Sequence, residues 1–182
     1  MNIYELKFDS NNFQSLLVTD FEKDGEKYDF EEVVPLLAKW DPPEVYIDSP
    51  LLRAGDFVEF WGNRPFAMTP GTLKKMRDII SPAGELLPLP CDGVEYTFLH
   101  VLVKVDCLDR KRSKSRHKEY FYDLKRFVFH RELVPNIPLF TIPETFGAVY
   151  TVERTGDPKT EFKAAVEYHG LTGLIFKKIW EG

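Results

Sequence analysis

The stretch EYTFLHVLVKVD, residues 95–106, constrains the fold more than any other part of the chain. Mostly apolar residues fill both alternating sets of positions, which are Leu99, Val101, Val103 and Val105 on one face and Tyr96, Phe98, His100 and Leu102 on the other. Because successive side chains of a strand point to opposite faces of a sheet, this pattern predicts a central strand covered on both faces.

Other stretches have the length and residue types of strands. They are IYELKF, SLLVTDF, residues 45–47, GDFVEFWG, the long KEYFYDLKRFVFH, PLFTIP, GAVYTVE and LTGLIFKKIW. The segment FEEVVPLLAKW is interrupted by Pro35, so we expect it to be irregular or helical for a turn or two.

Two helices are predicted from their end signals. Thr69 can cap a helix that has Pro70 in its first position and runs to Ile80. The second opens with Asp157 as its cap and closes at Gly170, since glycine readily takes the left-handed conformation that ends helices. Strands outnumber helices and do not alternate with them. The predicted class is therefore α+β, with a mainly antiparallel sheet and two principal helices.

Length and composition favour one globular domain over residues 1–182. The chain is 43% hydrophobic and 14% aromatic, which is enough to bury a core. Within it, the proline-rich stretch SPAGELLPLP predicts a boundary between two sub-lobes, 1–90 and 91–182.

The net charge of -5 is unevenly distributed. Residues 1–60 hold 14 acids and 5 bases, so the N-terminal lobe is acidic. Such a surface either serves solubility or meets a basic partner, because complementary potentials speed encounter and reject wrong partners.

Several classes of site have no signal in the sequence. Cys91 and Cys107 form no CxxC pair, and the sequence holds no HExxH, GxSxG, GxGxxG or phosphate-loop motif. We therefore expect no catalytic residue, no metal and no cofactor. No apolar run is long enough for a membrane helix and no secretion signal precedes the first strand, so a cytoplasmic protein is expected.

The stretch VDCLDRKRSKSRHK carries two opposite kinds of charge. Asp106 and Asp109 could share a cation or a proton, but acids at the exit of a strand more often cap the turn, and we favour that interpretation. Six bases follow, which are Arg110, Lys111, Arg112, Lys114, Arg116 and Lys118. They could neutralise phosphates, but no aromatic residue is interspersed before Tyr120, so we expect a mobile, solvated loop and no nucleic-acid partner.

Three stretches together resemble the C-terminal half of immunity family eleven of bacterial polymorphic toxin systems, a family first catalogued as a domain of unknown function. They are YTFLHVLVKVDCLDRKRS, FVFHREL with PLFTIPE, and FKAAVEYHGLTGLIFKKIW, within residues 57–180. The motif residues that the resemblance implies are Asp106, Leu108, Asp109 and Ser113 in a bend, and Gly170, Leu171, Gly173 and Phe176 near the end of the chain. We interpret them as architectural, and the basic loop after Asp109 departs from the family pattern.

The resemblance implies a cytoplasmic protein that binds a cognate toxin and neutralises it without catalysis. Aromatic residues often dominate protein interfaces, and those near the acidic lobe are Trp40, Phe60, Trp61 and Phe66. Two other hypotheses remain open. One is a nucleic-acid-binding module that uses residues 110–118, and the other is a hydrolase centred on Asp106 and Asp109, which lacks the usual set of acid, base and nucleophile.

Overall fold

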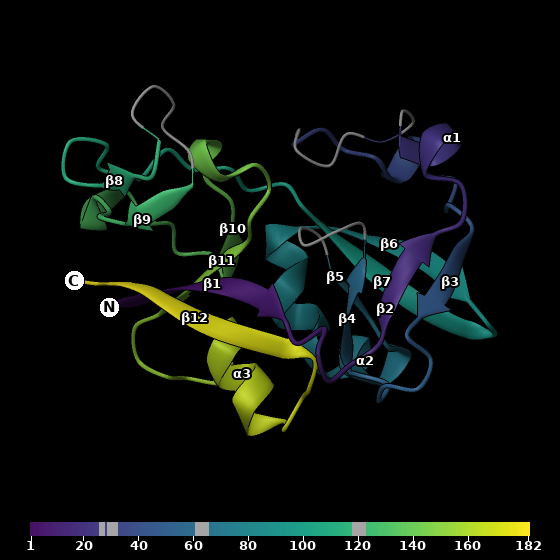
Figure 1. Cartoon of the computed structure of the whole chain (residues 1–182). Coiled ribbons are helices and arrows are strands. Elements are labelled where there is room, and N and C mark those ends of the chain that lie inside the picture. The colour runs from purple at the N-terminus through teal and green to yellow at the C-terminus, as the bar shows by residue number, and fades with distance from the viewer. Residues whose placement is uncertain (26–27, 29–32, 61–65, 118–122) are drawn as a thin grey trace.

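The computed structural model describes residues 1–25, 28, 33–60, 66–117 and 123–182. Within these residues the chain forms three α-helices and twelve strands, most of them paired antiparallel, so the predicted α+β class is confirmed. The strands make a four-stranded sheet, a six-stranded sheet and a separate two-stranded hairpin (Figure 1).

The four-stranded sheet joins the two ends of the chain. β1 (Asn2–Phe8) pairs with β11 (Tyr150–Glu153) on one side and with β12 (Leu174–Glu181) on the other, and β10 (Leu139–Phe140) lies beyond β11. All these pairs are antiparallel, and all four strands lie where the sequence predicts them. The Met1 ammonium group donates a hydrogen bond to the Gly182 carbonyl over 2.9 Å.

The six-stranded sheet has the order β3–β2–β4–β5–β7–β6. Its strands are β2 (Ser15–Val18), β3 (Val45–Asp48), β4 (Phe57–Phe60), β5 (Phe66–Met68), β6 (Gly84–Cys91) and β7 (Val94–Val101). Neighbours are antiparallel except for β2 and β4. The sheet curls until its two edge strands, β3 and β6, approach each other. The Cys91 thiol of β6 lies 3.4 Å from the Val45 carbonyl oxygen of β3.

β7 is the predicted strand with both faces covered, but it is shorter than expected. Its last four residues are all buried, and it ends at Val101 instead of Asp106. The chain then crosses to the other sheet, where Val105 donates to the Thr141 carbonyl (2.9 Å) and Thr141 donates to the Val103 carbonyl (2.8 Å). Residues 102–106 therefore connect the two sheets.

The stretch 81–90, in which the sequence predicts a boundary between two sub-lobes, is part of the six-stranded sheet. Most of it is β6, which forms a continuous hairpin with β7 through the turn at Asp92 and Gly93. Pro88 and Pro90 fit because β6 is an edge strand, where a residue without an N–H group does not break the sheet. The expected division at residue 90 thus falls inside a hairpin, and β1 belongs to the sheet of residues 139–181.

The helices confirm one prediction and shift another. α2 (Pro70–Ile80) has the predicted bounds, and the Thr69 hydroxyl accepts the Thr72 amide at 3.3 Å. α3 (Phe162–Tyr168) starts later than predicted, because Asp157 closes a separate turn by accepting the Glu161 amide at its carbonyl. The short α1 (Phe21–Gly25) was not predicted. The described part of FEEVVPLLAKW has one 3-10 turn (Leu37–Lys39), in line with the expectation for that segment.

One hydrophobic core lies between the two sheets and includes residues of α2 and α3. Phe57, Phe66 and Phe162 pack there with ring centroids 5.5 to 5.9 Å apart. A second cluster fills the curl of the six-stranded sheet, and a third lies against the four-stranded sheet under residues 103–142. Both sheets contribute side chains to the first cluster and so share a core.

Candidate functional site

The bend at Asp106–Ser113 is held by its own side chains. The Asp109 carboxylate accepts the Arg112 amide at 3.0 Å and the Arg112 Nε at 2.5 Å, and the Asp109 carbonyl accepts the Ser113 amide at 2.9 Å. These hydrogen bonds from Arg112 lower the pKa of Asp109. Asp109 therefore caps a turn, as the sequence favoured.

Buried groups fasten this bend to the chain that follows the hairpin. The buried Ser113 hydroxyl donates to the Val128 carbonyl (3.2 Å) and accepts the Val128 amide (2.9 Å). Leu108 is buried and bridges Phe129. The bases of residues 110–117 are exposed to solvent, as predicted. The segment is not a loop throughout, because these contacts fix the bend and lead it into a short paired strand.

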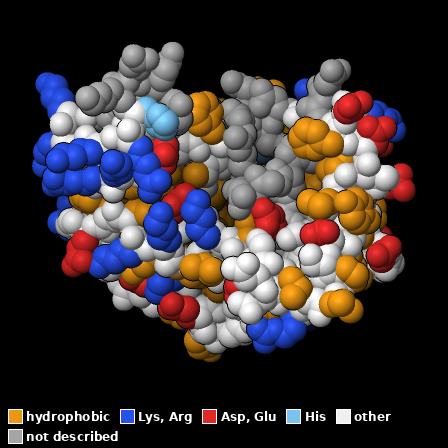
Figure 2. Space-filling view, viewed as in Figure 1, with side chains coloured by type: hydrophobic (Ala, Val, Ile, Leu, Met, Phe, Trp, Pro, Cys, Tyr) orange, Lys and Arg blue, Asp and Glu red, His pale blue; other side chains and the backbone are white. Residues whose placement is uncertain are grey.

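That strand is β8 (Lys114–Ser115), which pairs with β9 (Leu124–Arg126). The predicted long strand at 118–130 is wrong in its described part, where only β9 is regular and the chain afterwards bonds to the bend. Lys118 lies outside the described residues. Figure 2 shows lysine and arginine side chains gathered on the side of the molecule that carries β8 and β9.

Asp106 and Asp109 are each paired with a different arginine. Arg110 pairs with Asp106 at 2.9 Å and closely with the buried Glu144, whereas Asp109 is engaged by Arg112. Burial raises the pKa of Glu144, and Arg110 opposes that rise. Among the described residues, no group of three potential ligands could hold a metal ion.

The sequence did not indicate Glu144, because it lies 38 positions after Asp106 and only the fold brings both carboxylates to Arg110. The signal in the sequence is weak, a carboxylate in the turn PETFG between two strands. Cys107 lies near this cluster and is fully buried. Burial, with the negative charge of Glu144, raises the pKa of the Cys107 thiol to about 12, so it is not an activated nucleophile.

A cleft of about 340 Å³ opens between the hairpin and the four-stranded sheet. Its charged lining residues are Glu5, Lys7, Arg116, Asp123 and Lys177, and its apolar and neutral ones are Leu124, Phe127, Thr145, Phe146, Ala148 and Tyr150. These residues come from β1, β9, β11, β12 and the loops beside them. The sequence does not indicate this cleft, because its walls come from four separate parts of the chain.

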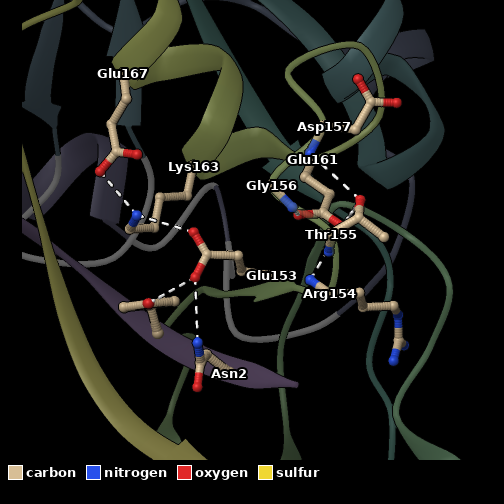
Figure 3. Close-up of polar contacts among 10 residues, drawn as sticks. Asn2, Glu153, Arg154, Thr155, Gly156, Asp157, Glu161, Lys163 and Glu167 are labelled. Carbon is tan, nitrogen blue, oxygen red and sulfur yellow. Dashed lines mark hydrogen bonds and ion pairs between the residues drawn. The ribbon is translucent and has the colours of Figure 1, made fainter.

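A second polar cluster joins α3 to the four-stranded sheet (Figure 3). Lys163 Nζ lies 3.0 Å from Glu153 and 2.8 Å from Glu167, and Glu153 also accepts the Tyr4 hydroxyl at 2.8 Å.

Glu161 accepts the amides of Arg154, Thr155 and Gly156 at 2.8 to 3.0 Å. Burial opposes the ionisation of Glu161, but these three N–H groups outweigh it and lower its pKa. Glu153, Glu161 and Glu167 all bind groups within the fold, so we interpret this cluster as structural.

The second set of motif residues forms the turn from α3 into β12. Gly170 and Gly173 have positive φ angles of 63° and 99°. A Cβ atom on Gly173 would lie 2.0 Å from the Phe57 carbonyl oxygen, so this position admits only glycine. Leu171 and Phe176 pack against the shared core. These contacts support the architectural interpretation of the four residues, which stays a prediction.

Three of the aromatic partner-binding candidates are used in packing. Phe60 and Phe66 are 0% and 1% exposed and cannot contact a partner. Trp40 covers the open curl of the six-stranded sheet, with its indole Nε1 donating to the Pro88 carbonyl at 2.7 Å and its ring 4.7 Å from that of Tyr28. Trp61 lies outside the described residues.

A different set of apolar side chains is exposed on the acidic lobe. We define the N-terminal face by the exposed residues Phe21, Val34, Leu37, Tyr46 and Leu51 with the acids Asp20, Glu22, Asp41 and Glu44. Leu51 is fully exposed and Tyr46, on the edge strand β3, is 46% exposed. Lys23 and Lys39 are exposed in the same segments. Figure 2 shows hydrophobic and acidic side chains intermixed over the side that carries α1, β2 and β3.

Comparison with known proteins gives no relative. No protein-family model matches the chain, and no curated protein matches it. Among the described residues, no helix has both the length and the apolar character needed to cross a membrane.

Proposed function

We propose that the protein is an immunity-type protein that acts in the cytoplasm by binding a basic protein toxin through its N-terminal face. The observation that carries this proposal is the exposure of five large apolar side chains among acids on one lobe. Exposed apolar groups rimmed by charge are typical of protein-binding surfaces. The resemblance to immunity family eleven gives the class of partner.

The charge of this face fits a partner with a positive active site. A nuclease binds phosphates with lysines and arginines, and the acids at positions 20, 22, 41 and 44 would meet such residues in place of phosphate. The apolar side chains would supply the buried centre of the interface, while the acids would speed encounter. The acids at 106 and 109 are engaged by arginines, which favours a structural role for them over hydrolysis.

The test is to identify a toxin gene next to this one and to co-express its product with the protein, with growth and binding as readouts. The charge reversal Glu22→Lys/Glu44→Lys should slow association at low salt by about tenfold or more, because charged side chains steer encounter. Tyr46→Ala should speed dissociation by about tenfold, as expected for an aromatic residue at the centre of an interface.

Asp78→Lys on α2 is the matched control, since it reverses an exposed acid away from the N-terminal face. It should protect cells as well as the unchanged protein does. If the Glu22→Lys/Glu44→Lys and Tyr46→Ala variants protect cells and bind the toxin as well as the unchanged protein does, the proposed use of this face is contradicted. A toxin that does not bind the unchanged protein would contradict the function itself.

A further inference from the structure

The β8–β9 hairpin concentrates positive charge beyond what the linear run of bases provides. Residues 104–131 contain ten lysines and arginines and four acids. The remainder of the chain therefore has 14 bases and 25 acids. The fold brings Lys125 and Arg126 of β9 beside the run that ends in β8. A polyanion would be attracted here and repelled by most of the remaining surface.

Half of these ten cations have no acidic partner among the described residues. Arg110, Arg112 and Arg116 have carboxylate partners. Five exposed cations lack one within the described part of the chain, and they are Lys111, Lys114, Lys125, Arg126 and Arg131. Lys114 lies directly opposite Arg126 in the hairpin. Like charges facing each other across two strands are unfavourable, and an anion between them would remove that cost.

The cleft beside the hairpin adds aromatic groups to this charge. Phe146 is 52% exposed at its wall, in a left-handed conformation with φ of 43° that is uncommon for a bulky residue. Phe127 lines the cleft from the hairpin side. The run of bases at residues 110–118 contains no aromatic residue, but the fold places Phe127 and Phe146 in the same cleft as Arg116.

The charges inside the cleft leave a positive excess. Lys7 and Lys177 share one carboxylate, that of Glu5, at 2.6 and 3.6 Å. Arg116 has a loose contact of 3.7 Å with Asp123. Three cations thus face two acids, and all three are accessible at the surface.

We propose that the protein binds single-stranded nucleic acid, with phosphates along the β8–β9 hairpin and a base in the cleft beside Phe146. Proteins that bind single strands combine a basic track with aromatic side chains on which bases stack. A cleft of about 340 Å³ has the size of a small-molecule site and suits an unpaired nucleotide. A duplex has no free base to insert. This surface is separate from the N-terminal face, so the inference does not depend on the proposed function.

The experiment uses the full chain and fluorescein-labelled single strands of about 12 nucleotides, oligo(dT) and oligo(U), in fluorescence polarisation. We expect affinity to fall steeply between about 50 and 200 mM salt, since each phosphate contact releases counterions. Lys114→Glu/Arg126→Glu should weaken binding by at least about tenfold and flatten the salt dependence. Lys74→Glu/Lys75→Glu makes the same charge change on exposed residues of α2, and its affinity for the single strands should stay close to that of the unchanged protein.

Phe146→Ala should weaken binding of the single strands by about tenfold without changing the slope of affinity against salt, because stacking is not electrostatic. Phe146→Asn is the second variant, since asparagine accepts the left-handed backbone and keeps the turn. A thermal melt of each variant checks that it is folded.

Three outcomes would overturn the proposal. They are no binding at about 50 mM salt, equal loss in the α2 control, or a duplex of the same length that binds as tightly as the single strand and is unaffected at Phe146. An acidic protein that competes better than either nucleic acid would assign the hairpin to a protein partner instead.

Discussion

The bend at Asp106–Ser113 and the turn at Gly170–Gly173 reach fixed shapes by opposite means. The bend depends on side-chain atoms that are present, since Ser113 bonds both backbone groups of Val128. The turn depends on atoms that are absent, since Gly173 lies against the Phe57 carbonyl. The comparison teaches that both regions are architectural but differ in what damages them. Truncating a side chain should lower the stability of the bend, and adding a side chain to a glycine should lower the stability of the turn.

The largest effect is expected from Gly173→Ala. The new methyl group would overlap the Phe57 carbonyl oxygen, and φ of 99° is unfavourable for alanine. Overlap and strain together should lower the free energy of unfolding by about 3 kcal/mol or more. Urea unfolding followed by tryptophan fluorescence measures it. A loss no greater than that of Gly170→Ala would show that the contact with Phe57 is not tight.

Ser113→Ala should have the next largest effect, about 2 kcal/mol, because it leaves the buried amide of Val128 without its partner, while the Val128 carbonyl keeps the Asp109 amide at 2.8 Å. Ser81→Ala is the matched control, as its hydroxyl bonds the Arg77 carbonyl at an exposed position. The control should lose little stability in the same urea titration. Equal losses at Ser113 and Ser81 would remove the claim that the bend is anchored through Ser113.

Gly170→Ala isolates the backbone part of the turn. Its φ is 63°, and nothing lies within 4 Å of an added Cβ atom, so only conformational strain remains. We expect a loss of about 1 kcal/mol, and a smaller loss for Gly170→Asn. Thermal unfolding of both variants beside Gly173→Ala separates strain from overlap. A larger effect of asparagine than of alanine would contradict this account.

Asp109→Asn should have the smallest effect and a defined pH dependence. The folded-state pKa of Asp109 lies below its ordinary value of 3.8, so the carboxylate stabilises the fold above that value and loses the effect as the pH falls through the folded pKa. The stability difference between Asp109→Asn and the unchanged protein should therefore be larger at about pH 7 than at about pH 3. A difference that is constant with pH would mean that the charge of Asp109 does not contribute.

The elements with local signals could be predicted from the sequence. α2 has a capping threonine, a proline in its first turn and helical spacing, and all three act within its own residues. The residue pattern of each strand in the four-stranded sheet and the capping role of Asp109 are local in the same sense, although the pairing of those strands is not. They depend on neighbours along the chain, which a sequence displays directly.

The features that failed depend on partners far away in the chain. The prolines of residues 81–90 suggested a boundary between two sub-lobes, yet pairing with β7 makes most of that segment an edge strand. Phe60 and Phe66 were candidates for a partner-binding surface because they are aromatic and near the acidic segment, but packing within the fold buries them. The contact of Glu144 with Arg110 and the cleft around Phe146 arise only when separate segments meet.

The position of β1 has a consequence for how the chain folds during synthesis. This strand is synthesised before both of its neighbours, β11 and β12, which belong to residues 150–181. Its hydrogen-bonding edges lack their native partners until residues 150–181 have been synthesised. Such long-range pairing slows folding and leaves apolar strands open to aggregation, so we expect nascent chains to need protection by chaperones.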